Sequence, residues 1–118
     1  MTYKKGQGIL GRIRFKDGSM PKYDRTYLIV ETGENYIKTL NVSGLRGKEH
    51  KLLMPSNIEI QNYNPPFQKP SFVKLDSLTK TNVDGSEGLR ILHSGQCLDN
   101  NELKKILAQL KHFQNGNT

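Results

Sequence analysis

The sequence predicts a mainly β domain: a small, strongly bent barrel of antiparallel strands whose core is covered by one α-helix at the C-terminal end. Three observations predict it. Apolar and polar residues alternate over short runs, Gly, Pro and Asn separate these runs, and an apolar stripe at helical spacing occurs near the C-terminal end. A length of 118 residues suits one modest core, so we expect residues 1–118 to form a single domain.

The predicted strands follow the apolar runs in order. The run Tyr27-Leu28-Ile29-Val30 has the length of a buried strand, and Asp17-Gly18 marks a turn before it. Pro55 cannot donate to a β-ladder, so it breaks the fourth strand. Three of the five prolines fall in residues 62–71 and predict an extended surface loop. We expect five or six strands, over residues 8–15, 26–31, 36–42, 52–54 continuing as 57–61, 71–81 and 89–92.

One helix is predicted at the end of the sequence. Asp99 can accept hydrogen bonds from the first turn, and Glu102 three residues later completes a capping-box pattern. Leu98 and Leu103 are placed to form a hydrophobic staple. We expect a helix over residues 99–113 and a frayed tail over 114–118, with a core-facing stripe made of Leu103, Ile106, Leu107, Leu110 and Phe113.

The positive charge of the chain is concentrated in its first part. The net charge is +7, and residues 1–80 hold 14 of the 18 lysines and arginines against 7 of the 11 acids. Such asymmetry is typical of a surface that meets a polyanion, because Lys and Arg displace condensed counterions from a phosphate backbone. The alternative is that the charge serves only solubility. If residues 8–15 form a strand, Arg12 and Arg14 share one face and Lys16 follows at its end.

Arg25 is the most informative candidate site residue. It opens the apolar run that follows a turn-like stretch, so a rigid strand would hold its planar, permanently charged guanidinium, which suits phosphate. The alternative is an arginine that pairs with Asp24 or caps the loop. Among the aromatic residues, we expect at most Tyr63 and Phe67, on the proline-rich loop, to be free to stack on unpaired bases.

Composition excludes several function classes. Cys97 is the single cysteine, so an internal disulfide cannot form, and we expect a small buried hydrophobe there. The three histidines are far apart in sequence and lack carboxylates or thiols at ligand spacing, so we expect no metal site and no cofactor. We expect no membrane span and no signal peptide, and therefore a cytoplasmic protein.

Four segments carry a resemblance to a known family. These are Lys5-Gly6-Gln7-Gly8-Ile9-Leu10, Arg25-Thr26-Tyr27-Leu28-Ile29-Val30, Asn41-Val42-Ser43-Gly44, and Ser71-Phe72-Val73-Lys74-Leu75-Asp76 followed by Thr79-Lys80-Thr81. In this order, over about residues 5–113, the chain resembles the MazF/PemK toxins of bacterial toxin–antitoxin modules. The resemblance implies an SH3-like barrel, a homodimer and an mRNA interferase that cuts single-stranded RNA without a metal ion. It also implies a cognate antitoxin protein as partner.

The resemblance also implies roles for individual residues. It places catalytic roles on Arg25, Ser43 and Asp76. From the residues alone, the general base can be either Asp76 or His50, because carboxylate and imidazole side chains both serve as bases in catalysis. Either residue can also be a plain surface or salt-bridge residue. We expect the RNA-binding residues to be Arg12, Arg14, Lys16, Lys22, Arg46, Lys48, His50, Lys74 and Lys80.

Three other functions stay open at the level of sequence. A nucleic-acid-binding barrel without catalysis needs only the same basic surface. A gyrase poison of the related CcdB type would use apolar and aromatic residues at the extreme C-terminus, whereas the end of this chain is polar. A third alternative is a partner-binding remnant of the fold.

Overall fold

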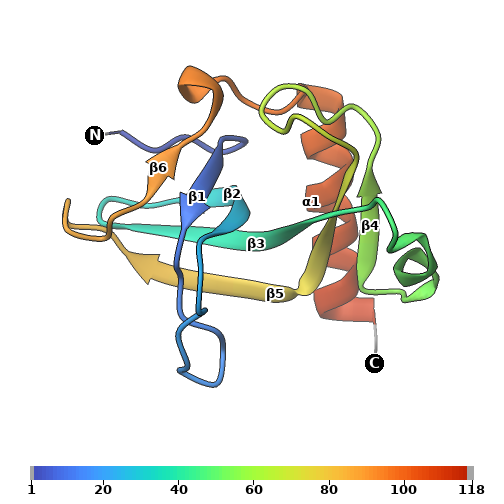
Figure 1. Cartoon of the computed structure of the whole chain (residues 1–118), viewed down its shortest axis with the longest axis horizontal. Helices are drawn as coiled ribbons and strands as arrows, with labels where there is room; N and C mark the ends of the chain where they lie inside the picture. Colours follow the sequence, from blue (N-terminus) through green and yellow to red (C-terminus); the bar gives the residue numbers. More distant parts are fainter. Residues whose placement is uncertain (1, 117–118) are drawn as a thin grey trace.

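The chain folds into one bent antiparallel sheet with a helix packed against it (Figure 1). A computed structural model describes residues 2–116. Over these residues, six strands lie in the sheet order β4-β5-β3-β2-β1-β6. The elements are β1 (Gly8–Gly11), β2 (Arg25–Thr32), β3 (Tyr36–Gly44), the 3₁₀ helix η1 (Glu49–Leu53), β4 (Asn57–Ile60), β5 (Ser71–Asn82), β6 (Arg90–Ile91), the 3₁₀ turn η2 (His93–Gly95) and α1 (Asn100–Gly116).

This architecture confirms the predicted fold class, a mainly β domain with a C-terminal helix. The strand pairs are antiparallel throughout the described part of the chain. The sheet does not close on itself there, because β4 and β6 are its two edges. The long strands β3 and β5 cross from the half that holds β1, β2 and β6 to the half that holds β4 and α1 (Figure 1). The sheet thus bends as a barrel does, with an open seam.

The two faces of the bent sheet bury separate sets of apolar side chains. Alternate residues of a strand point to opposite faces, so Leu28 and Val30 of β2 enter one set and Tyr27 and Ile29 the other. Core 1 lies under α1 and contains Leu28, Val30, Leu40, Val42, Ile60, Phe67, Val73, Leu75, Leu98, Leu103, Ile106 and Leu110. Core 2 contains Ile9, Ile13, Tyr27, Ile29, Ile37 and Leu89.

A β-bulge in β5 produces the bend. Asn41 of β3 lies opposite Lys74, whereas Thr39, two residues away, lies opposite Thr79. The extra residues of β5 leave backbone groups without ladder partners, and the Ser77 hydroxyl satisfies two of them. It accepts from the Asn41 N–H at 2.8 Å and donates to the Lys74 carbonyl at 2.6 Å. A bulge of this kind bends the strand and re-aims its side chains.

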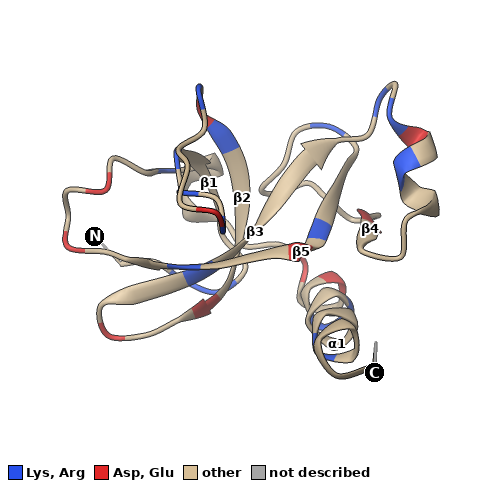
Figure 2. Cartoon of the chain, turned by 90° about the horizontal axis from the view of Figure 1, so that it is seen from below, with Lys and Arg blue, Asp and Glu red and all other residues tan. Residues whose placement is uncertain are grey.

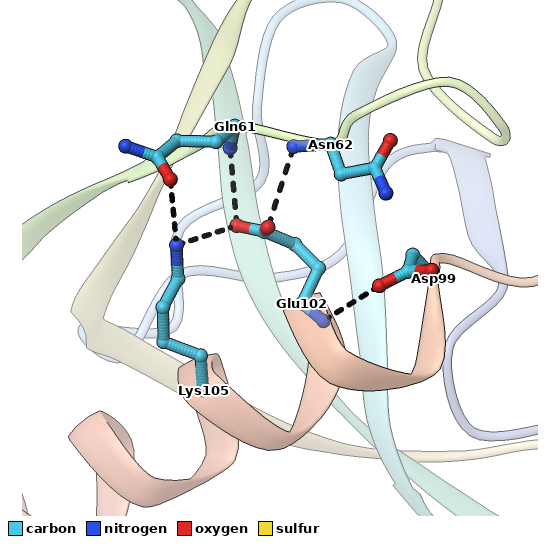
Figure 3. A network of polar contacts seen from close by, with 5 residues as sticks. All are labelled: Gln61, Asn62, Asp99, Glu102 and Lys105. Atoms are coloured by element: carbon cyan, nitrogen blue, oxygen red, sulfur yellow. Dashed lines mark hydrogen bonds and ion pairs between the residues drawn. The ribbon is translucent and has the colours of Figure 1, made fainter.

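A buried carboxylate ties α1 to the end of β4 (Figure 3). Glu102 is only 7% exposed, and its two oxygens accept from the backbone N–H groups of Gln61 at 3.0 Å and Asn62 at 3.3 Å. Lys105 pairs with the same carboxylate at 3.0 Å. Asp99 accepts from the Glu102 N–H, as the predicted N-cap requires. The predicted capping box is therefore only half present, because the Glu102 side chain turns away from the helix.

Several predicted element boundaries were wrong for local reasons. β1 ends at Gly11, four residues early, because the Ile13 N–H donates to the Tyr27 hydroxyl at 3.1 Å and not to the ladder. Arg12 and Arg14 therefore do not share a strand face. Residues 52–54 belong to no strand; η1 and its following turn form there, held by the Asn57 side chain, which donates to the Lys51 carbonyl.

The C-terminal helix is longer than predicted. It continues to Gly116, so residues 114–116 of the expected frayed tail are helical, and residues 117 and 118 lie outside the described part. Its buried residues include Leu103, Ile106 and Leu110, which confirms the predicted stripe.

The expected exposure of three residues was also wrong. Cys97 is exposed, because it sits in an isolated bridge with Gln7 beyond the end of the sheet. Phe67 is 4% exposed and lies in core 1, close enough to β1 that a Cβ on Gly8 would meet its ring at 2.9 Å. Tyr63 packs against the same core. The proline-rich loop therefore folds inward over core 1.

Over residues 2–116, no helix combines the length and the apolar character that a membrane crossing requires.

Replacing Glu102 by Ala should lower the free energy of unfolding by about 2–3 kcal/mol, because two backbone N–H groups lose a charged acceptor. Urea denaturation monitored by circular dichroism measures this loss. Glu59→Ala, at an exposed carboxylate of β4, is the matched control and should change the unfolding free energy by less than about 0.5 kcal/mol. Equal effects of the two substitutions would contradict the anchoring role.

Replacing Ser77 by Ala should destabilise the domain by about 1–3 kcal/mol, since the Asn41 N–H is left without its acceptor. Hydrogen exchange of the Asn41 amide should accelerate in this variant beyond what the global loss explains. Ser86→Ala, at an exposed loop hydroxyl that donates to Asp84, serves as control. Unchanged protection of Asn41 would show that the hydroxyl does not hold the bulge.

Candidate nucleic-acid interface

Arg25, at the first position of β2, lies close to two aromatic rings. Its guanidinium carbon lies 5.5 Å from the ring centroid of Phe15 and 5.3 Å from that of Tyr23. Asp24 does not neutralise it, because Asp24 pairs with the Nε of Arg12 at 3.6 Å. The Nε of Arg25 is buried and has no hydrogen-bond partner among the described residues. The two rings hold the guanidinium by cation–π contact, and this contact leaves its N–H groups able to donate to an anion.

Lys74 lies on the same face of the sheet as Arg25. Tyr27 is opposite Asn41, and Asn41 is opposite Lys74, so these three side chains form a row across the sheet. Arg25 precedes Tyr27 by two residues and therefore points the same way. The half-buried Lys74 thus extends the basic face from β2 to β5.

Charged groups crowd around this lysine. The pKa of Lys74 is lowered, first by burial and then by the positive charges of Lys51, Arg25 and Lys48. Asp76 acts in the opposite direction and favours the charged form of Lys74. The charges of Arg25 and Asp76 thus both act on Lys74, in opposite directions.

Asp76 borders a hollow of about 330 Å³ on this face. Asn41, Ser77 and Tyr27 line it from the sheet, and the loop after β1 supplies another wall that includes Arg14 and Lys16. Asp76 is exposed, since the bulge carries it out of the ladder. A carboxylate in this position is open to a ligand that enters the hollow.

Ser43 lies at the edge of the same face. It follows Asn41 by two residues in β3, so the two side chains share a side, and it pairs with Phe72 of β5. Continuing the β2–β3 register by one step beyond the Thr26–Val42 pair places Ser43 across from Arg25. The structure thus places Arg25, Ser43 and Lys74 on one face, with Asp76 at its border.

A further group of basic residues lies around η1 (Figure 2). Arg46, Lys48 and Lys69 line a second hollow, of about 890 Å³, together with Glu49 and Glu59. His50 is exposed on η1 itself. Lys51 and Lys69 were not predicted from the sequence. The role of Lys51 was missed because residues 52–54 were expected to form a strand. Instead, η1 forms there and brings Lys51 toward Lys74.

Other predicted RNA-binding residues have local partners or lie elsewhere. Arg14 donates to the Gly18 carbonyl at 2.9 Å within its own loop, and Lys22 is exposed on that loop. The Lys80 ammonium lies 4.4 Å from the ring centroid of Tyr36. Lys80 pairs with Lys38 of β3, which is three residues from Asn41 and therefore on the opposite face of the sheet. Lys80 is therefore not part of the cluster around Arg25.

The fold and this face define a class: a small, mainly β domain with a helix-covered core and a basic surface of suitable chemistry for a phosphate chain. A scan against models of known protein families finds no match to the sequence, and no curated protein matches it. A functional assignment therefore depends on the site itself and on the residues that resemble the MazF/PemK segments.

Replacing Lys74 by Met should stabilise the domain at neutral pH. Because the folded-state pKa of Lys74 is lowered, its protonated form opposes folding at neutral pH, and this opposition fades as pH rises through the folded pKa toward the unfolded value. The urea midpoint of Lys74→Met should exceed that of the wild type at pH 7, and the difference should shrink in high salt.

Lys80→Met is the charge-matched control for this prediction. It removes one positive charge too, but it loses the contact with Tyr36, so its midpoint should not rise. A Lys74→Met variant that is less stable than the wild type would show that Lys74 is a structural residue and not a charge held at a binding site.

Proposed function

We propose that the protein is a metal-independent endoribonuclease of the toxin type, acting on single-stranded RNA. One observation carries the proposal: Arg25 and Lys74 share a face with Ser43, and Asp76 is electrostatically coupled to Lys74. Two fixed cations can stabilise the charge that develops on a phosphate during cleavage. A carboxylate and a lysine of lowered pKa can exchange protons with it.

The proposed reaction is a transfer within the RNA chain. The 2′-oxygen attacks the adjacent phosphorus and loses its proton to the Asp76 carboxylate, forming an O2′–P bond. The P–O5′ bond breaks, and the leaving O5′ takes a proton from the Lys74 ammonium. The products are a 2′,3′-cyclic phosphate and a 5′-hydroxyl, with one proton gained by Asp76 and one lost by Lys74.

The lowered pKa of Lys74 supports its role as the acid. A general acid works best when its pKa lies near the working pH, and burial together with Lys51, Arg25 and Lys48 moves this lysine in that direction. Arg25 would bind the phosphoryl oxygens through its fork of donors. Ser43 would donate a hydrogen bond that positions one of these oxygens.

The biological setting is proposed from the resemblance alone. A toxin of this type would act as a homodimer in the cytoplasm, and a cognate antitoxin would neutralise it by covering the basic face. An acidic segment on that antitoxin would match the charge of the Arg25 and Lys74 region.

Arg25→Ala should abolish cleavage, with a fall of at least about 100-fold in rate, because the developing charge loses a fixed donor. The assay is the incubation of purified protein with a long single-stranded RNA in excess chelator, followed by analysis of fragments and their termini. Arg90→Ala is the matched control, since Arg90 is an exposed arginine on the edge strand β6, and it should retain most of the activity.

Two results would contradict the proposal. Tight RNA binding without fragments would identify a non-catalytic nucleic-acid-binding domain. Fragments that end in 3′-hydroxyl and 5′-phosphate groups would exclude attack by the 2′-oxygen.

A further inference from the structure

Tyr23 is exposed to an extent that the fold does not require. Its relative exposure is 63%, and among the described residues it is the one aromatic side chain in the group of exposed large hydrophobics. It belongs to neither core 1 nor core 2. A large aromatic surface left in water at a charged site points to a ligand, because burial of that ring stabilises a complex.

The backbone around Tyr23 is fixed at both ends. Pro21, two residues before it, is buried, and Asp24 directly after it pairs with Arg12 across the loop. The loop itself is closed by the Phe15 N–H, which donates to the Ser19 carbonyl at 2.8 Å. The ring is thus presented by an ordered segment, and a ligand would meet it in place.

The ring of Tyr23 stands directly beside the proposed phosphate donor. Its centroid is 5.3 Å from the guanidinium carbon of Arg25, and the ring centroid of Phe15 is 5.5 Å from the same atom. A single nucleotide carries a phosphate and a flat base within the same short reach. One ligand of that kind can contact the cation and the exposed ring together.

We propose that Tyr23 is the base-stacking residue of the site: it receives the unpaired base next to the phosphate that Arg25 binds. The inference rests on the proposed function, which supplies the phosphate, and it adds the ligand feature that the ring selects. Stacking on an aromatic face is tolerant of base identity but requires a base that is free of its pairing partner. Tyr23 therefore restricts the substrate to single strands with intact bases.

A tryptophan at position 23 gives a direct test, because the chain contains no tryptophan. The Tyr23→Trp protein is titrated with a 2′-O-methyl oligonucleotide of mixed sequence, which resists attack by a 2′-oxygen, and with the same backbone carrying abasic sites. We expect quenching of the tryptophan fluorescence by the first probe and not by the second. Ala108→Trp, on an exposed position of α1, is the reporter control and should respond to neither.

Two further variants separate stacking from a structural role. Tyr23→Phe should bind the 2′-O-methyl oligonucleotide as the wild type does. Tyr23→Leu keeps apolar bulk but lacks a π face, so its affinity should fall by about tenfold or more, while its urea midpoint stays unchanged. Both variants should bind the abasic backbone equally, since the phosphate contact through Arg25 is intact.

The outcomes distinguish failure of this inference from failure of the proposed function. If the oligonucleotide binds but leaves the fluorescence of the Tyr23→Trp protein unquenched, or if Tyr23→Leu binds as tightly as Tyr23→Phe, then Tyr23 does not stack on a base and the phosphate site stands. If neither probe binds the wild type at moderate salt, the nucleic-acid interface itself is refuted and the inference falls with it.

Discussion

The hydroxyl of Ser77 holds the feature on which the rest of the structure depends. It occupies the β-bulge of β5 by accepting from the Asn41 N–H and donating to the Lys74 carbonyl. The bulge bends the sheet, and one face packs under α1 in core 1 while the other buries core 2. The same irregularity carries Asp76 out of the ladder while Lys74 remains in register with Asn41. Shape and charge placement therefore have one origin.

Crowding of positive charge on one face opposes folding, and the rest of the molecule offsets it. The pKa of Lys74 is lowered first by burial and then by the positive charges of Lys51, Arg25 and Lys48. The contributions that stabilise the folded state come from core 1, from core 2 and from the Glu102 anchor between α1 and β4. A stable scaffold that holds like charges together is typical of sites that bind a counter-charged ligand.

The sequence was a good guide to elements with long-range periodicity and a poor guide to local turns. The buried run after Arg25 and the stripe of α1 were predicted because many residues repeat the same signal. β1 was predicted too long because the hydrogen bond that ends it, from the Ile13 N–H to the Tyr27 hydroxyl, joins residues 14 apart. The alternation of apolar and polar residues does not indicate such a bond. Lys51 was missed and Tyr63 and Phe67 were misjudged for a related reason: turn geometry and loop packing, rather than composition, decide which side chains face the site. Tyr23 was set aside in favour of Tyr63 and Phe67 as an aromatic residue free to stack, and its 63% exposure shows that this choice was wrong.

The anchor at Glu102 has a consequence for the order in which the chain acquires its shape. Core 1 joins Leu28 of the second strand to Leu110 of the last helix, and the carboxylate of Glu102 secures a segment 40 residues earlier. Contacts of such wide sequence separation form late, because loop closure precedes any gain from them. During synthesis the apolar face of the strands therefore stays partly exposed until residues 99–110 emerge from the ribosome. The basic face reaches its final arrangement only at that stage, so under the proposed function a nascent chain would remain inert toward RNA.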